Sequence, residues 1–259
     1  MLNFKQNSTM SENQKVWKPT EEAKGKATQL RLFAALLWVG AIAAQVAAII
    51  MLRKQGENFM AWVIGLIVVD LILAIIGSML WKKSNRLDPA SEKNGFLFFM
   101  QSQLGVVVAV IAFLPLVIVI LTNKNISGKQ KAILGSIAGI AMVIAGISGA
   151  DFNPPSVEKY TEETNLVEAL TGTNNVYYTK GGGKYHIYED CYTIRNSDRL
   201  NGTVAEAHAG VANHSDFDLC GICKNKKMKE DGLSEETLNE KLEQVKAGLG
   251  VKTTPNETE

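Results

Sequence analysis

Four long apolar runs constrain this chain more than any other feature of its sequence. They cover residues 30–52, 59–81, 96–121 and 132–150. The shortest run spans about 28 Å as a helix, and the hydrocarbon core of a bilayer is about 30 Å thick, so all four can cross it. A backbone in lipid must satisfy its own hydrogen bonds, which predicts that each run is an α-helix. The short connections between the runs predict antiparallel neighbours in a four-helix bundle.

The charge of the chain changes where the last apolar run ends. Residues 1–150 contain 15 Lys and Arg against 7 Asp and Glu, whereas residues 151–259 contain 12 against 19. This division predicts a membrane domain with basic flanks, followed by an acidic soluble domain. An acidic domain does not favour nucleic acid as a partner. The expected partners are the lipid bilayer and a protein bound through the soluble domain.

Basic residues near the ends of the runs predict the orientation in the cell membrane. With the N-terminus inside, the inner segments hold ten Lys and Arg and the outer loops hold five. Because Lys and Arg are retained on the cytoplasmic side, this bias predicts that both termini are cytoplasmic. The reducing cytosol would also keep cysteine thiols available for a metal.

Small and polar residues recur along one side of three of the runs, at helical spacing. Such stripes let helix backbones approach closely, so they predict the inner faces of the bundle. The stripes are Ala41, Ala44, Gln45 and Ala48 in the first run; Asp70, Ala74, Gly77 and Ser78 in the second; and Gly135, Gly139, Met142, Gly146 and Gly149 in the fourth.

Asp70 is the one acidic residue at membrane depth. Its charge costs about 3 kcal/mol there unless the carboxyl is neutral or paired. Two interpretations stay open. Asp70 and Gln45 could form a proton or cation site of a small transporter or channel, or the protonated carboxyl could simply hydrogen-bond to Gln45 or to a serine inside the bundle.

The parts outside the apolar runs have distinct compositions. Residues 1–29 are predicted to form a polar tail. Residues 151–175 include Pro154 and Pro155 near their start, which cannot continue the last span, and are predicted to form a juxtamembrane linker or short helix. Residues 176–230 hold the metal motif described below, and residues 231–259 predict an amphipathic helix and a tail. Ser234 is the expected N-cap of that helix, whose apolar stripe is Leu238, Leu242, Val245 and Leu249.

The metal motif contains all 3 cysteines of the chain. His186 precedes Cys191 in the pattern His-x4-Cys, and after 28 residues Cys220 and Cys223 follow as Cys-x2-Cys. Three thiolates and one imidazole complete a tetrahedral ligand set, which predicts a structural zinc site with these four ligands. The alternatives are buried free thiols or a Cys220–Cys223 disulfide.

Two further histidines are weaker ligand candidates, because His208 lies in a predicted helix and His214 in a loop. Thr203 and Glu206 predict a capping box at the start of that helix. Residues 176–179 and 184–188 are rich in strand formers around a glycine turn, which predicts a hairpin that carries His186. Gly221 is expected to allow a tight turn around the metal.

The metal motif resembles the small Ada-type metal-binding module, whose pattern Tyr-His…Cys…Glu-Ala…Cys-x-x-Cys it repeats. The resemblance covers roughly residues 176–227. It implies that the module binds zinc. In the DNA-repair version of the module four cysteines hold the metal and the first accepts a methyl group from a phosphotriester. Here His186 occupies that first position, so the methyl transfer is not expected of this chain.

The expected fold is an all-α transmembrane four-helix bundle followed by a small α+β zinc-binding domain with a C-terminal helix. This arrangement is similar to uncharacterised bacterial membrane proteins. The expected function is that of an integral membrane protein that presents a structural zinc module for binding or scaffolding, without catalysis. The alternatives are a small transporter or channel that uses Asp70, and a zinc-dependent enzyme. A catalytic zinc would keep an open coordination position, and the four predicted ligands leave none.

Overall fold

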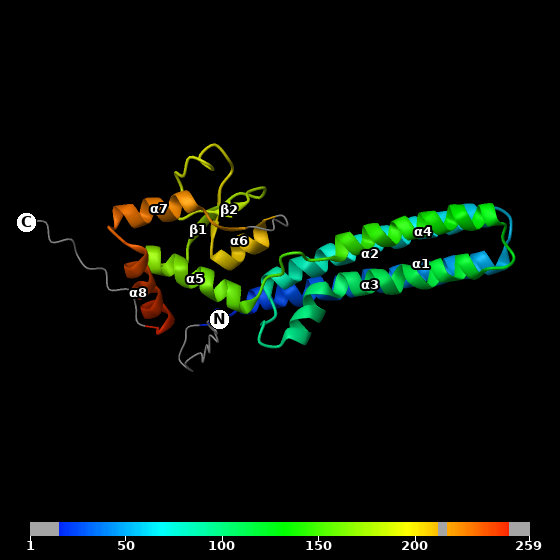
Figure 1. Ribbon diagram of the computed structural model, residues 1–259, viewed down its shortest axis with the longest axis horizontal. Coiled ribbons are helices and arrows are strands. Elements are labelled where there is room, and N and C mark those ends of the chain that lie inside the picture. Colours follow the sequence, from blue (N-terminus) through cyan, green and yellow to red (C-terminus); the bar gives the residue numbers. More distant parts are fainter. Residues whose placement is uncertain (1–15, 212–216, 249–259) are drawn as a thin grey trace, which may run out of the picture. The chain divides into compact units, whose positions relative to one another are not determined.

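The computed structural model describes residues 16–211 and 217–248 of the chain. The chain divides into two compact units, which we describe separately. The larger unit comprises residues 19–156, and the smaller comprises residues 157–259 together with 1–18. Long helices form the larger unit, and short helices and strands form the smaller one (Figure 1).

The larger unit contains four helices that are long and apolar enough to cross a membrane. They lie alongside one another in Figure 1. The shortest has 22 residues and spans about 33 Å. The prediction of four long apolar helices is therefore confirmed. The helices are α1 (Glu21–Lys54), α2 (Phe59–Leu87), α3 (Gly95–Thr122) and α4 (Gly128–Gly149).

The first helix begins earlier than its apolar run. The side chain of Thr20 accepts a hydrogen bond from the Ala23 amide at 3.1 Å and caps α1, which starts at Glu21. The predicted polar tail therefore ends before residue 21 rather than at residue 29, and residues 1–15 lie outside the described part of the chain. A helix extends past its apolar run because the cap, and not the loss of hydrophobicity, decides where it starts.

The inner faces of α1 and α2 agree with the predicted stripes, whereas the inner face of α4 does not. All eight stripe residues of α1 and α2 are buried. In α4 a Cβ atom at Gly139 or Gly146 would meet nothing within 4 Å. The alanine stripe one residue earlier faces the core instead, rotated by about 100°. The buried residues of α4 are Leu134, Ala138, Ala141, Ala145 and Gly149.

Gly149 is the predicted glycine of α4 that does meet a neighbouring helix. A Cβ atom at Gly149 would lie 2.5 Å from the carbonyl carbon of Gly105, and a Cβ atom at Gly105 would lie 2.8 Å from the carbonyl oxygen of Gly149. No side chain fits between the two backbones at these distances. The pair therefore sets how closely α3 and α4 approach.

Polar contacts join the helices at the end of the bundle where α2 and α4 end. Arg31 of α1 pairs with Asp88 just after α2, with 2.8 Å between the guanidinium and the carboxylate. Lys82 of α2 donates a hydrogen bond to the carbonyl oxygen of Ser148 at 2.7 Å. These contacts pair the charges of Arg31 and Asp88 and give a hydrogen-bond donor to a carbonyl oxygen in the last turn of α4, which has no partner within the helix.

The smaller unit contains four helices and four strands among its described residues. The strands form two small sheets: β1 pairs with β3 antiparallel, and β2 pairs with β4 parallel. The helices are α5 (Val157–Thr171), α6 (Val204–Gly210), α7 (Gly221–Glu230) and α8 (Glu235–Lys246); the strands are β1 (Val176–Tyr178), β2 (Lys184–Tyr185), β3 (Leu200–Gly202) and β4 (Asp218–Leu219).

The predicted hairpin is reduced to a single bridge. Tyr177 and His186 exchange two backbone hydrogen bonds of 2.7 and 2.8 Å. Beyond this bridge β1 and β2 turn to other partners, β3 and β4. Strands of two or three residues are too short to show an alternation of apolar and polar residues, so the sequence did not predict β3 or β4.

Helix α5 is part of the core of the smaller unit rather than a linker. Its buried residues include Tyr160, Val167 and Leu170, and it contacts α6, α7 and α8. The predicted Ser234 cap of α8 is confirmed, and Leu238 and Val245 of its stripe are buried. The fourth stripe residue, Leu249, lies outside the described residues. The amphipathic helix α8 therefore packs its apolar side against the core of the smaller unit, to which α5 also contributes.

Candidate metal centre

The four predicted metal ligands come together in the smaller unit. One ligand atom from each of His186, Cys191, Cys220 and Cys223 can be chosen so that all four lie within 4.8 Å of one another. All four residues are buried, and the three cysteines are free thiols. The cluster is compatible with a metal site, and the disulfide alternative is absent from the structure.

Parallel strand pairing brings His186 and Cys220 side by side. Tyr185 and Leu219 are register partners in the β2–β4 ladder, and the two ligands are the next residues of the two strands. The amide of Cys220 donates a hydrogen bond to the carbonyl oxygen of Tyr185 at 2.8 Å. Ligands that are 34 positions apart in the sequence thus become neighbours through two residues of sheet.

Helix α7 places Cys220 and Cys223 next to each other. Cys220 is its N-cap and Cys223 lies in its first turn, and residues three apart share a helix face. The positive end of the helix favours thiolates at this position. Gly221 is an ordinary helical residue without a positive φ, so the expected role of this glycine in a tight turn is wrong: the helix itself makes the turn.

Cys191 reaches the cluster from the loop between β2 and β3. Its carbonyl oxygen accepts hydrogen bonds from the amides of Ile194 and Arg195 at 2.9 and 3.0 Å, which closes a helical turn directly after it. The hydroxyl of Thr193 lies 3.2 Å from Cys191 Sγ, where it can donate to a thiolate. Thr193 is a supporting residue that the sequence analysis missed, and the Cys-x-Thr spacing was its signal.

Burial keeps the His186 imidazole neutral and makes the Cys223 thiol harder to ionise. Desolvation lowers the pKa of His186, so its ring is neutral at pH 7 and has a lone pair to donate. Burial raises the pKa of Cys223 to about 12. For Cys191, burial also raises the pKa, but hydrogen bonds with Thr193, Cys223 and Cys220 together outweigh it, and the net pKa is lowered. A bound cation would be needed to hold the Cys223 sulfur as a thiolate at neutral pH.

A pocket of about 210 Å³ opens beside the cluster, and two of the candidate ligands, Cys191 and Cys223, are among the residues that line it. The ammonium group of Lys226 lies 4.2 Å from the centre of the Tyr188 ring on its wall. Tyr192, also on the wall, is 64% exposed. The candidate metal centre therefore lies next to a pocket whose wall includes an exposed aromatic side chain.

The other histidine candidates are not in the cluster. His208 lies in α6, where its Nε2 is 2.5 Å from a carboxylate oxygen of Glu163 in α5. The rings of Tyr160 and Phe217 pack on His208 with centroids 4.8 and 5.0 Å away. His208 is therefore a core residue that joins two helices, while His214 lies outside the described residues.

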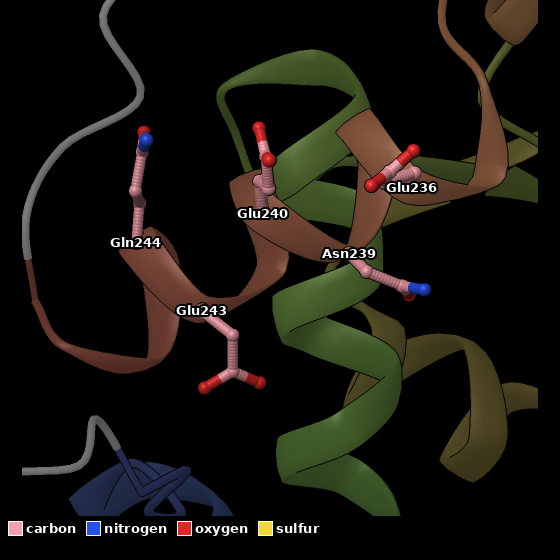
Figure 2. A pocket seen from close by; sticks show the side chains of 5 residues that line it. All are labelled: Glu236, Asn239, Glu240, Glu243 and Gln244. Carbon is pink, nitrogen blue, oxygen red and sulfur yellow. The ribbon is translucent and has the colours of Figure 1, made fainter.

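A second surface hollow runs along α8 and offers no comparable ligand set. It is lined by Glu236, Asn239, Glu240, Glu243 and Gln244. Figure 2 shows these side chains standing apart along the outer face of the helix and pointing in different directions. Carboxylates that do not converge cannot share one ion, so this hollow is a solvated acidic face.

The predicted intramembrane residues Asp70 and Gln45 are both buried inside the bundle, at 0% and 4% exposure. Among the described residues, neither carboxylate oxygen of Asp70 has a hydrogen-bond partner, and neither does Nε2 of Gln45. The interpretation in which Asp70 is hydrogen-bonded to Gln45 or to a serine is therefore not supported by the structure. The carboxyl is buried and unsatisfied.

Comparison with known proteins places the chain in no family: no family model, no curated protein and no solved structure matches it.

Proposed function

We propose that this chain is an integral membrane protein whose four long helices anchor a cytoplasmic module built around a structural zinc ion. The module serves in binding or scaffolding. The observation that carries the proposal is the convergence of four buried ligand atoms, three sulfur and one nitrogen, within 4.8 Å of one another. The four membrane-length helices support the anchoring role.

The donor set favours zinc. Ligand atoms of one tetrahedral zinc, at about 2.3 Å for sulfur and about 2.0 Å for nitrogen, lie about 3.6 Å apart. Cys223 Sγ and His186 Nδ1 are 3.6 Å apart. Thiolates are soft ligands, and three of them with one imidazole suit zinc better than magnesium or calcium. The order of the ligands along the chain also agrees with the resemblance to the Ada-type module.

The position of the site favours a structural role. Its ligands come from the end of β2, a loop turn, the end of β4 and the first turn of α7, so one ion ties four segments together. These segments include strands of two residues that would hold little on their own. When bound, the ion would supply cross-links between them, and the protein fills all four of its positions.

The side of the membrane follows from charge and redox chemistry. The basic bias of the span ends favours a cytoplasmic module. Three thiols without a disulfide are suited to a reducing compartment. The partner we expect is a protein, because the net negative charge of residues 151–259 repels nucleic acid.

Metal analysis of the full-length protein in detergent tests the proposal. We expect one zinc per chain in the wild type, and a large loss in His186→Ala and Cys220→Ser, because each removes one of four ligands. His208→Gln is the matched control, since it changes a buried histidine outside the cluster. Wild-type protein that is folded and free of zinc, or a His186→Ala variant with full zinc content, would show that the proposal is wrong.

A further inference from the structure

Asp70 is an unusual group for the interior of a helix bundle. Its side chain is 0% exposed, so it points into the bundle and not toward lipid. It lies about 17 Å along α2 from Phe59, near the middle of a hydrocarbon core of about 30 Å. Neither of its carboxylate oxygens has a hydrogen-bond partner among the described residues. A group placed at such a cost marks a functional site.

No charged side chain is available to neutralise Asp70. Between Arg31 and Arg53, α1 has no charged or titratable residue, and α3 has none over its whole length. After Lys131, α4 also has none. In α2 Asp70 is the one such residue before Lys82. Because these segments of the described helices have no side chain that can supply a positive charge, the Asp70 carboxylate would have to be neutralised by binding a proton.

Gln45 of α1 lies at the same depth as Asp70. A Cβ atom at Gly77 would be 2.6 Å from Trp38 Nε1, and a Cβ atom at Gly40 would be 3.3 Å from the Leu73 side chain. These two contacts define an antiparallel register in which Gln45 faces residues 68–70 of α2. The amide nitrogen of Gln45 is also buried without a partner. An unpaired donor and an unpaired carboxyl thus share one level of the bundle.

A metal ion would find too few ligands at this level. A Cβ atom at Gly105 would lie 3.0 Å from the Ser78 hydroxyl of α2 and 2.8 Å from the carbonyl oxygen of Gly149. These contacts place residues 109–117 of α3 and 137–145 of α4 at the level of Asp70, and neither segment has a polar side chain. Hard cations need about six oxygen ligands, whereas the side chains offer those of Asp70 and Gln45. A proton needs a single oxygen.

Polar groups lead away from Asp70 toward one end of the bundle. Toward the end of α2 lie the buried Ser78 of α2 and Ser102 of α3, and Trp38 Nε1, which has no partner among the described residues. Toward the start of α2 the buried side chains are apolar. They include Val63, Ile67, Leu52, Leu116, Ile120 and Leu134.

We propose that Asp70, with Gln45 at the same level of the bundle, is an intramembrane proton-binding site that exchanges its proton with the end of the bundle where α2 ends. At neutral pH the carboxyl holds the proton and is uncharged. Release of the proton requires water to enter along Ser78 and Ser102, because the opposite path is apolar. The site lies in the larger unit and does not depend on the metal centre.

Reaction with dicyclohexylcarbodiimide tests whether Asp70 is protonated. The reagent enters lipid and adds to a carboxylic acid: the acid proton moves to one nitrogen, the carboxylate oxygen bonds to the central carbon, and the adduct rearranges to an N-acylurea without a leaving group. With full-length protein in lipid nanodiscs at pH 7, we expect mass spectrometry to find the adduct at Asp70, decreasing as the pH rises. Asp70→Asn should lose it and keep its zinc content, which separates this test from that of the metal.

Infrared spectroscopy tests the path. The carbonyl band of a protonated carboxyl should be present in the wild type and absent in Asp70→Asn, and transfer to heavy water should shift it at a measurable rate. We expect Ser78→Val to slow this exchange severalfold, whereas Ile67→Leu at the apolar end should leave it unchanged. No band and no adduct at Asp70 in folded protein would overturn the proton site. Equal rates of hydrogen–deuterium exchange at Asp70 in the Ser78→Val and Ile67→Leu variants would overturn the proposed path.

Discussion

Single residues decide how closely the parts of this protein approach one another. In the candidate metal cluster, a neutral imidazole and three sulfur atoms lie close enough to share one ion, and the Thr193 hydroxyl lies 3.2 Å from the sulfur of Cys191. In the bundle, Gly105 and Gly149 let two backbones touch. A larger side chain at Gly105 or Gly149 would push the two helices apart, and a different side chain at any of the four cluster positions would remove one candidate ligand.

The glycine contact yields a prediction at this scale. Gly149→Ala places a methyl group 2.5 Å from the backbone of α3, and we expect a loss of about 1–3 kcal/mol of bundle stability. Gly139→Ala is the matched control, because nothing lies within 4 Å of its Cβ position. It should be neutral or stabilising by up to about 1 kcal/mol, since alanine favours helix. Thermal unfolding of both variants in the same detergent provides the comparison, and equal melting temperatures would contradict it.

At the scale of elements, α5 and α6 are joined by a buried pair. His208 of α6 and Glu163 of α5 are 2.5 Å apart, with 8% and 13% of their side chains exposed. The ring of Tyr160 packs against the histidine. Because this pair is buried between the two helices, its loss should loosen α5 from the rest of the smaller unit.

We therefore expect Glu163→Ala to destabilise the smaller unit by about 1–3 kcal/mol, since it leaves the His208 ring buried without its partner. Glu162→Ala removes an exposed carboxylate from the same helix and should change stability by less than about 0.5 kcal/mol. Urea titration followed by hydrogen exchange of peptides from α5 and α6 measures both. A Glu163→Ala variant as stable as Glu162→Ala would show that the pair contributes nothing.

At the scale of the whole molecule, both units bury an apolar core, and the smaller unit also contains the candidate metal cluster. The long helices form one core and the smaller unit has its own, next to a separate small cluster of buried residues that contains Ile194 and the three cysteines. Removal of the proposed zinc by a chelator should therefore raise hydrogen exchange in β2, β4 and α7 and leave α1 to α4 unchanged. Exchange followed peptide by peptide with and without chelator measures this. Unchanged protection of α7 would argue against a metal that holds the module together.

Orientation in the membrane is the second prediction for the whole molecule. With both termini inside, a Glu57→Cys variant in the α1–α2 connection should react with an impermeant maleimide on intact cells. A Lys93→Cys variant in the α2–α3 connection should react only after lysis. Both residues are exposed in the structure, so access alone does not distinguish them. The reverse pattern of labelling would place the module outside.

The sequence by itself determined the four long helices and predicted the four residues that the fold brings together as candidate metal ligands. Runs as apolar as these can satisfy their backbone in lipid only as helices, and three thiols spaced around one histidine restrict the ligand choice to a few residues. Capping residues such as Thr203 and Ser234 were equally legible, because a cap depends on side chains three residues away.

The tertiary structure decided everything that depends on partners distant in the chain. It paired β1 with β3 and β2 with β4, because strands of two or three residues have no pattern of their own and take whichever edge the core presents. It turned the alanine stripe of α4 inward, because only packing selects between two faces of similar small residues. It also left Asp70 without a partner, because a helix can bring a residue to the core without bringing the group that would satisfy it.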